Sequence, residues 1–375
     1  MNNRERTMAI LNYEKYDRMP VVHFGYWQEL LHKWHREGHL TKEEADGYGD
    51  GNQMDKKIAD KLGFDFCWTF QLGAYWIMLL PRFEHKVIEE RPDGSVIYQN
   101  SDGLIEEAKP GLRSIPATVG TLMTGREAWE ELYKPKLQPD TKRYGSPEQL
   151  AKAKIYFDEM TQQPPGLYAG GLYGSIRDML GIERLSYLYA DDEELYIEII
   201  DTIGNLCYEN VKAMLELGLK PDLLHFWEDI CFKNGPLVNP KIFREYVGPH
   251  YKKITDLGKK YGITIVSLDS DGCIDELLPI WLENGVNTMF PIEVGTWGSS
   301  IGPWRKTHGK LLRGVGGMKK NVLACDFKAI DEEIERLKPL VDLGGYIPCP
   351  DHRLPPGATW DNTRYYCDKM RKTFG

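Results

Sequence analysis

Residues 262–272 read G-I-T-I-V-S-L-D-S-D-G, and this pattern predicts the fold. The run from Ile263 to Val266 is apolar and β-branched, which is typical of a buried strand in a parallel sheet. Charged side chains do not fit inside such a strand, so we expect Asp269 and Asp271 to lie just beyond its end. In an α/β barrel, the active site is built at the carboxyl ends of the strands. The stretch therefore predicts one half of a metal site or of an acid/base site.

Similar apolar runs recur along the chain and alternate with helical patterns. Eight predicted strands begin near residues 21, 64, 166, 222, 262, 286, 311 and 345. The clearest helix, over residues 191–217, has apolar side chains on one face and is followed by Gly218. Eight strands that alternate with helices are the count of a closed (β/α)8 barrel, the TIM-barrel fold. We therefore predict an α/β protein with a single (β/α)8 barrel domain over residues 1–375.

One region departs from the alternating pattern. Between residues 85 and 109, short alternating runs are separated by two D-G pairs, Asp93-Gly94 and Asp102-Gly103. Alternation with tight D-G turns is typical of antiparallel strands. We predict an N-terminal antiparallel β insertion, a meander that covers one rim of the barrel.

The composition narrows the class of protein. The chain has 375 residues, of which 42% are hydrophobic and 27% charged, as in ordinary globular proteins. A formal net charge of -9 argues against binding to nucleic acid or to an anionic membrane, and favours small molecules and proteins as partners. The charged N-terminus and the lack of a long apolar run predict a cytoplasmic protein. Seven cysteines without a C-x-x-C pair argue against a disulfide scaffold or a zinc ribbon.

Polar side chains that follow the predicted strands form the candidate site. They are His225, Glu228, Asp229, Asp269, Asp271, Glu293 and His352. If they meet at the mouth of a barrel, such acids and imidazoles can transfer protons or bind a metal ion. Each also has a structural interpretation: a helix cap for Glu228 or Asp229, an ion pair for Asp269, and a hydrogen-bonded core acid for Glu293. Both interpretations stay open at this point.

Aromatic side chains near the same strand ends predict a pocket wall. Tyr26, Trp27, Trp76 and Tyr173 could line it, although core filling accounts for most aromatic residues in proteins. The glycine-rich stretch 170–174 precedes a predicted helix but has neither glycine pattern of the nucleotide-binding loops. We expect instead that its main chain comes close to the pocket.

Five segments carry a resemblance to a known superfamily. They are R-E-R-T-M-A-I-L-N-Y-E-K-Y-D-R-M-P-V-V (4–22), W-E-D-I-C-F-K-N-G-P-L-V-N-P-K-I-F-R-E-Y-V-G-P-H (227–250), S-L-D-S-D-G (267–272), P-I-E-V (291–294) and L-P-P-G-A-T-W-D-N (354–362). They resemble the uroporphyrinogen decarboxylase superfamily over nearly the whole chain. The resemblance implies a (β/α)8 barrel, in agreement with the strand count. It also implies one of two functions, since the superfamily contains porphyrinogen decarboxylases and zinc-dependent methyltransferases that work with a corrinoid protein.

Two departures favour the methyltransferase branch. The decarboxylases carry an arginine-rich R-Q-A-G-R-Y-like signature after their first strand, whereas residues 23–34 here read H-F-G-Y-W-Q-E-L-L-H-K-W and lack those arginines. The coenzyme M methyltransferases carry H-x-C-G and a later cysteine. Here Asp269 and Asp271 stand at the H-x-C positions, and His352 stands at the place of the last cysteine. The resemblance therefore implies a metal site whose ligands have changed from sulfur to oxygen and nitrogen.

Carboxylate and imidazole ligands leave zinc a harder and stronger Lewis acid than thiolates do, which suits an oxygen substrate. We therefore predict a zinc-dependent methyltransferase, similar to the first component of O-demethylase systems. It would move a methyl group from an O-methyl compound, an aryl methyl ether, to the Co(I) of cobalamin on a separate corrinoid protein. The predicted metal ligands are Glu228, Asp269, Asp271 and His352. The predicted catalytic residues are His225, Glu228 and Asp229. The predicted substrate-binding residues are Tyr26, Trp27, Trp76, Tyr173 and Glu293.

Two other functions stay open. The first is a metal-independent decarboxylase of a tetrapyrrole, in which Asp269 or Asp271 would pair with pyrrole N–H groups. The second is a non-catalytic barrel that only binds a corrinoid protein. The sequence does not determine the methyl donor, the corrinoid partner or the oligomeric state, for which a homodimer is one option.

Overall fold

The structure is a computed structural model that describes residues 1–68, 72–74, 76–109 and 116–375. Its centre is a seven-stranded parallel sheet in the order β15-β14-β13-β12-β9-β8-β3. The strands are β3 (Leu72–Ala74), β8 (Gly166–Gly170), β9 (Leu223–Trp227), β12 (Ile265–Asp269), β13 (Thr288–Phe290), β14 (Arg313–Met318) and β15 (Tyr346–Pro350). Every residue of β8, β12, β13 and β15 is buried, as expected for parallel strands covered on both faces.

A separate parallel pair joins β1 (Val22–His23) to β2 (Phe66–Cys67). Beyond β1, the chain lies beside the segment that follows β15, because Tyr26 and Leu354 form a parallel bridge and the Leu354 amide donates to the Gly25 carbonyl at 3.0 Å. Within the described ranges, the hydrogen bonds show a seven-stranded parallel sheet and a separate parallel pair, and the closed eight-stranded ring of the prediction is not shown. The predicted strand at 64–70 corresponds to β2 in part, and its residues 69 and 70 lie outside the described residues.

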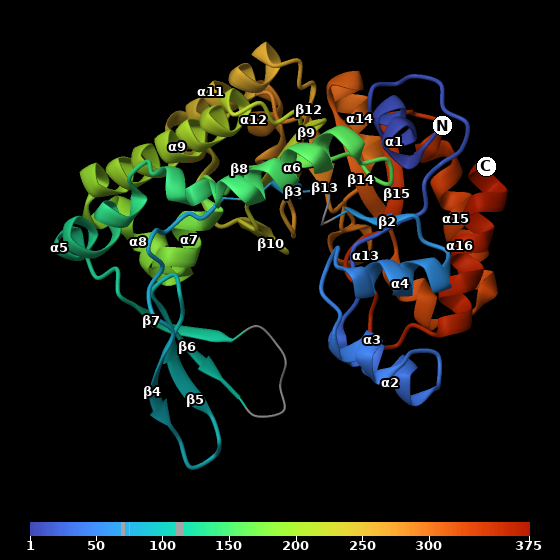
Figure 1. Ribbon diagram of the computed structural model, residues 1–375, viewed down its shortest axis with the longest axis horizontal. Helices are drawn as coiled ribbons and strands as arrows, with labels where there is room; N and C mark the ends of the chain where they lie inside the picture. The colour runs from blue at the N-terminus through green and yellow to red at the C-terminus, as the bar shows by residue number, and fades with distance from the viewer. Residues whose placement is uncertain (69–71, 75, 110–115) are drawn as a thin grey trace.

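Helices alternate with the strands, as the sequence pattern predicts. Those that follow the strands from β8 onward are α7 (Gly174–Leu180), α8 (Ile182–Asp191), α9 (Glu193–Glu216), α11 (Gly248–Lys260), α12 (Leu278–Glu283), α14 (Ile301–His308), α15 (Phe327–Val341) and α16 (Trp360–Phe374). Figure 1 shows α9, α11 and α12 on one side of the molecule and α14, α15 and α16 on the other. Local sequence signals set several helix ends: Asp192 caps α9, and Asp326 caps α15.

Further helices lie in the part of the chain before β8. They are α1 (Asn3–Leu11), α2 (Gln28–Arg36), α3 (Lys42–Asp46), α4 (Gln53–Leu62) and, after the insertion, α6 (Pro147–Glu159). Local sequence signals also set the starts of two of these helices: Thr41 and Glu44 form a capping box on α3, and Ser146 caps α6 with Pro147 in its first turn. The remaining short elements are α5 (Arg126–Ala128), η2 (Trp129–Tyr133), η3 (Lys134–Leu137), η4 (Thr141–Tyr144), β10 (Cys231–Phe232), β11 (Gly235–Pro236), α10 (Pro240–Ile242), η5 (Phe243–Val247), α13 (Val294–Trp297), η6 (Gly309–Leu311) and η7 (Lys320–Ala324).

The antiparallel insertion is present and is longer than predicted. Its sheet has the order β4-β5-β6-β7, with β4 (Lys86–Glu90), β5 (Val96–Gln99), β6 (Leu104–Ala108) and β7 (Ala117–Thr121). The sequence missed β7, because A-T-V-G-T is short, contains a glycine and follows no D-G turn. In Figure 1 this sheet projects from the rest of the molecule below α7 and α8.

The main-chain pairing of β12 corrects one expectation. Asp269 is the last residue of the strand rather than a residue beyond its end. It pairs in register with Trp227 on one side and with Phe290 on the other, so the strand pairing on both sides includes Asp269. A carboxylate is therefore held inside the sheet, and only 3% of Asp269 is exposed.

The two faces of β9 are distinguished by what its side chains touch. Leu224 lies against the Gly258 position of α11, and the Phe226 ring packs on Tyr251 of the same helix with centroids 4.9 Å apart. Because side chains alternate along a strand, His225 and Trp227 point to the opposite face, away from the outer helices. Their register partners Ser267 and Asp269 on β12 share that inner face.

Two further observations concern the whole chain. Five of the seven cysteines are buried. Among the described residues, no helix combines the length and the apolar character needed to cross a membrane.

Candidate functional site

Three aspartates from two strand ends meet at the carboxyl edge of the sheet. Asp229 follows β9, Asp269 ends β12, and Asp271 lies two residues further on. Each offers a carboxylate oxygen, and these oxygens lie within 4.8 Å of one another. The main chain fixes the arrangement, because the Asp271 amide donates to Asp229 Oδ1 at 3.1 Å. Three acidic side chains held this close form a natural site for a cation or for shared protons.

His352 completes this acid cluster, which we define as Asp229, Asp269, Asp271 and His352. Its Nε2 lies 3.2 Å from Asp271 Oδ2, although the two residues are 81 positions apart in the sequence. The imidazole ring is sandwiched between Trp27, which stacks on it at 5.7 Å, and Phe24, at 4.8 Å. The segment after β15 thus brings an aromatic-flanked imidazole to the acidic edge of β12.

Burial and mutual repulsion perturb the acids in and beside the cluster. Burial and the Asp271 carboxylate raise the pKa of Asp229 to about 7. Burial, Asp229 and Asp271 raise the pKa of Asp269 well above its ordinary value. In a protein without a cation here, these groups are therefore harder to ionise than free aspartate, which is typical of functional sites.

Glu293 supports the cluster from the next strand. It follows β13, and its Oε2 accepts hydrogen bonds from the Gly272 amide at 2.7 Å and from the Trp297 indole. Burial and the Asp271 charge raise the pKa of Glu293. The structure thus places this predicted substrate-binding residue where it holds the loop that carries Asp271.

Glu228 does not face the cluster, which corrects the prediction of a metal-ligating and catalytic role. Its Oε1 accepts from the Leu172 amide at 2.7 Å and from the Tyr251 hydroxyl, and its Oε2 accepts from the amides of Tyr173 and Gly174 at 2.9 and 2.7 Å. The side chain therefore fills the glycine-rich turn at 170–174, the one that precedes α7. Burial raises the pKa of Glu228, while the four donors favour its ionised form.

His225 lies on the inner face of β9, in register with Ser267 of β12 and Tyr168 of β8. It is buried, and burial lowers its pKa to about 4, so the ring is neutral at physiological pH. The side chain of His225, a predicted catalytic residue, therefore lies in the interior of the sheet, on the same face of β9 as Trp227.

The four residues of the predicted aromatic wall lie in four different environments. Trp27 contacts the cluster through His352. Trp76 is fully buried, donates its indole N–H to the Tyr168 carbonyl at 2.9 Å and packs on the Tyr168 ring. The rings of Tyr26 and Tyr173 do not join them: Tyr26 packs with Trp34, Tyr48 and Phe64, and Tyr173 hydrogen-bonds Tyr196 and packs on Phe243 of the outer layer.

A hollow of about 270 Å³ is connected to the cluster through Trp227, although no residue of the cluster lines it, and its wall includes residues that the sequence did not single out. Trp227, the register partner of Asp269, forms part of its wall. Arg177 of α7 links the two places: one nitrogen donates to the Asp229 carbonyl, another to Asp178 Oδ1 at 2.9 Å, and its guanidinium lies 5.4 Å over the Trp227 ring. The position of Arg177 just after the glycine-rich turn is the sequence signal that could have identified it.

The fold is similar to that of a methyltransferase from Methanosarcina mazei. The two chains are 15% identical, with a TM-score of 0.62, and the match covers 100% of this chain and 99% of the other. A protein assigned as a vitamin-B12 independent methionine synthase from Listeria monocytogenes matches with a TM-score of 0.42 at 12% identity, over 96% of this chain and 100% of the other, which is too distant to support an argument. Neither a protein-family profile nor a curated protein sequence matches the chain. The likeness to the Methanosarcina mazei methyltransferase therefore shows the fold.

A second group of residues could also hold a metal ion. His23, Asp55 and Cys67 are buried, and one ligand atom from each lies within 4.8 Å of the others. However, His23 Nδ1 accepts the Gly25 amide at 3.1 Å, which leaves the ring proton on Nε2, the nitrogen 3.7 Å from Asp55 Oδ1. A metal ion at Nε2 would have to displace that proton, so these donors suit a metal less well than the acid cluster does.

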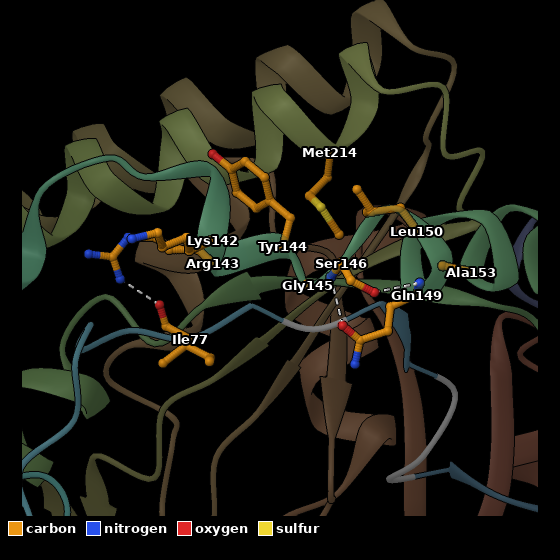
Figure 2. A pocket seen from close by; sticks show the side chains of 10 residues that line it. All are labelled: Ile77, Lys142, Arg143, Tyr144, Gly145, Ser146, Gln149, Leu150, Ala153 and Met214. Atoms are coloured by element: carbon orange, nitrogen blue, oxygen red, sulfur yellow. Dashed lines mark hydrogen bonds between the residues drawn. The ribbon is translucent and has the colours of Figure 1, made fainter.

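A larger hollow, of about 640 Å³, lies elsewhere, among η4, α6 and α9. Figure 2 shows Tyr144, Leu150 and Met214 around it, with Ser146 and Gln149 hydrogen-bonded to each other. None of the predicted site residues lines it. Titratable groups converge on the acid cluster, and we therefore place the functional site there despite the smaller hollow.

Proposed function

We propose that the protein is a zinc-dependent methyltransferase that moves a methyl group from an O-methyl compound, an aryl methyl ether, to the Co(I) of a separate corrinoid protein. One observation carries the proposal: the oxygens of Asp229, Asp269 and Asp271 lie within 4.8 Å of one another, and His352 Nε2 lies 3.2 Å from Asp271 Oδ2. The site stands at the carboxyl ends of parallel strands, where enzymes of this architecture act. The similarity in fold to a protein named a methyltransferase supports the same reaction class.

The donor set fits a divalent metal ion. Asp269, Asp271 and His352 are the ligands that we propose, and zinc accepts carboxylate oxygen and imidazole nitrogen in catalytic sites. Asp271 Oδ1 is buried and has no hydrogen-bond partner in the described part of the chain, as expected of an atom available to a ligand. Glu228 is left out of the set, because main-chain amides and Tyr251 use both of its oxygens.

The proposed reaction exchanges one bond of the methyl carbon for another. Co(I) supplies the electron pair of the new bond to the methyl carbon and becomes Co(III), the bond between the methyl carbon and the ether oxygen breaks, and the oxygen keeps the pair of that bond and takes a proton. Zinc, when bound, would act as a Lewis acid toward the ether oxygen. Asp229 lies beside the proposed ligands and is the group placed to pass the proton to the leaving oxygen. Trp227 and the hollow beside it would hold the aryl group and exclude water.

The test combines metal analysis with methyl transfer. Purified protein is expected to contain zinc and to form methylcobalamin from free cob(I)alamin and a methoxyarene, followed by absorbance. Asp271→Ala and His352→Ala are each expected to lower bound zinc and to slow transfer by about 100-fold or more, the range typical for loss of a metal ligand or its support. The exposed His85, replaced by Ala, is the matched control.

Other outcomes would point elsewhere. Protein without zinc, together with undiminished methyl transfer in both variants, would rule out the metal site. Decarboxylation of a porphyrinogen would favour the decarboxylase alternative instead. Binding of a corrinoid protein with no methyl transfer from any donor would favour a non-catalytic partner.

A further inference from the structure

The hollow beside the acid cluster has the size and the walls of a site for one aromatic ring. Its volume is about 270 Å³, and an apolar cavity of about 150 Å³ is enough to bind benzene. Trp227 and Tyr168 contribute rings from β9 and β8, and Met179 of α7 contributes a thioether. Such a mixture favours a flat, polarisable ligand.

The polar wall comes from α7. Ser175 and Asp178 lie three residues apart and therefore on one face of the helix, and both line the hollow. Asp178 Oδ1 accepts both of its hydrogen bonds from Arg177, at 3.2 and 2.9 Å. Within the part of the chain that the structure describes, Asp178 Oδ2 and Ser175 Oγ have no hydrogen-bond partner, so both remain available to a ligand.

The positive charges near the hollow are already paired. On the side of the insertion, Arg82 donates to both oxygens of Asp102, at 2.9 and 3.0 Å. On the side of α7, Arg177 pairs with Asp178 and donates to the Asp229 carbonyl. A ligand carboxylate would therefore meet two aspartates whose arginines are engaged, whereas a hydroxyl donor would meet a free carboxylate oxygen.

We propose that the hollow selects aryl methyl ethers that carry a hydrogen-bond donor, such as a phenolic hydroxyl, and that Asp178 is the residue that recognises it. The same side chain weakens the binding of methoxybenzoates, because its carboxylate repels theirs. This inference rests on the proposed methyl transfer and adds the class of substrate. Asp178 is a specificity-determining residue here and takes no part in breaking the bond to the methyl group.

Direct binding tests this assignment without relying on methyl transfer. Isothermal titration calorimetry of the intact protein is expected to show that 2-methoxyphenol binds at least about tenfold more tightly than 4-methoxybenzoate. The Asp178 carboxylate accepts a hydrogen bond from the phenol, whereas it repels the carboxylate of the benzoate. In Asp178→Asn, the ratio is expected to fall toward one, mainly because methoxybenzoate binds better. The matched control is Asp191→Asn, an exposed aspartate in an ion pair with Arg184.

The possible results separate this inference from the proposed function. Equal affinity for the two ligands, no binding of methoxyphenol at millimolar concentration, or an unchanged ratio in Asp178→Asn would each overturn the role of Asp178. Thermal unfolding shows whether that variant is folded, and Asp178→Ala, which removes the acceptor, is expected to weaken methoxyphenol binding about tenfold. Preserved selectivity without any methylcobalamin formation would instead contradict the proposed methyl transfer.

Discussion

At the scale of single residues, His225 shows how the sheet interior controls an ionisable group. Its Nδ1 is buried and has no hydrogen-bond partner among the described residues. Burial lowers its pKa from 6.5 to about 4. The imidazole is thus kept neutral by desolvation and not by a neighbouring charge, which argues for a packing role between Tyr168 and Ser267.

This environment predicts an acid sensitivity. Between pH 6.5 and about 4, the unfolded chain binds a proton at His225 that the folded protein excludes, so stability falls as the pH falls through this window. The expected loss is about 1.4 kcal/mol per pH unit. His225→Gln is expected to flatten this part of the profile, as measured by urea unfolding at a series of pH values. An unchanged slope in His225→Gln, compared with an exposed His85→Gln control, would contradict the assignment.

At the scale of elements, Glu228 explains why the turn before α7 is rich in glycine. A side chain at Gly171 would collide with the Trp227 carbonyl, and one at Gly174 with the Glu228 carbonyl. The main chain of the turn therefore approaches β9 closely, and its amides point at the Glu228 carboxylate. The arrangement resembles an anion site at a helix N-terminus whose anion is supplied by the protein itself.

Replacing this carboxylate should destabilise the element without affecting the proposed metal site. Glu228→Gln turns an acceptor into a donor that faces amide N–H groups, so we expect a loss of about 2 to 4 kcal/mol in the free energy of unfolding. Urea unfolding measures the loss, and zinc content should stay that of the wild type. The control is Glu216→Gln on the exposed face of α9. A folded Glu228→Gln variant that has lost its zinc would restore Glu228 as a ligand.

At the scale of the whole molecule, Arg143 connects segments that are far apart in the sequence. It is 2% exposed, and its guanidinium donates to the carbonyls of Ile77, Met78, Lys136 and Gln138, at distances from 2.6 to 3.0 Å. Figure 2 shows the bond to Ile77. Arg143 thus ties the chain that enters the insertion to the chain that leaves it.

The loss of this connection should destabilise the protein as a whole. Arg143→Met leaves buried carbonyls without donors, and we expect a cost of about 2 to 4 kcal/mol, together with a lower midpoint of thermal unfolding. Arg244→Met is the control, because Arg244 forms an exposed ion pair with Glu283. Equal stability of the two variants would show that the carbonyls find other partners.

Local patterns in the sequence determined much of the fold. The apolar runs at 166–170 and 222–227 correspond to β8 and β9 within one residue, and the caps at Thr41, Ser146 and Asp326 depend only on neighbouring residues. Such features are predictable because the interactions that form them span a few positions. The fourth strand of the insertion was missed for the same reason, since it depends on a partner strand and not on its own alternation.

The sequence by itself determined that acids and a histidine stand at strand ends, and it predicted Glu228, Asp269, Asp271 and His352 as a set of metal ligands. Only the tertiary structure decided which way each side chain points: Glu228 toward the turn before α7, Tyr173 toward the outer helices, and Asp229 toward Asp271. It also brought Asp178, which pairs with Arg177, to the wall of the hollow. The physical reason is that residue type and spacing fix the available chemistry, whereas direction is fixed by hydrogen bonds and packing between segments far apart in the chain.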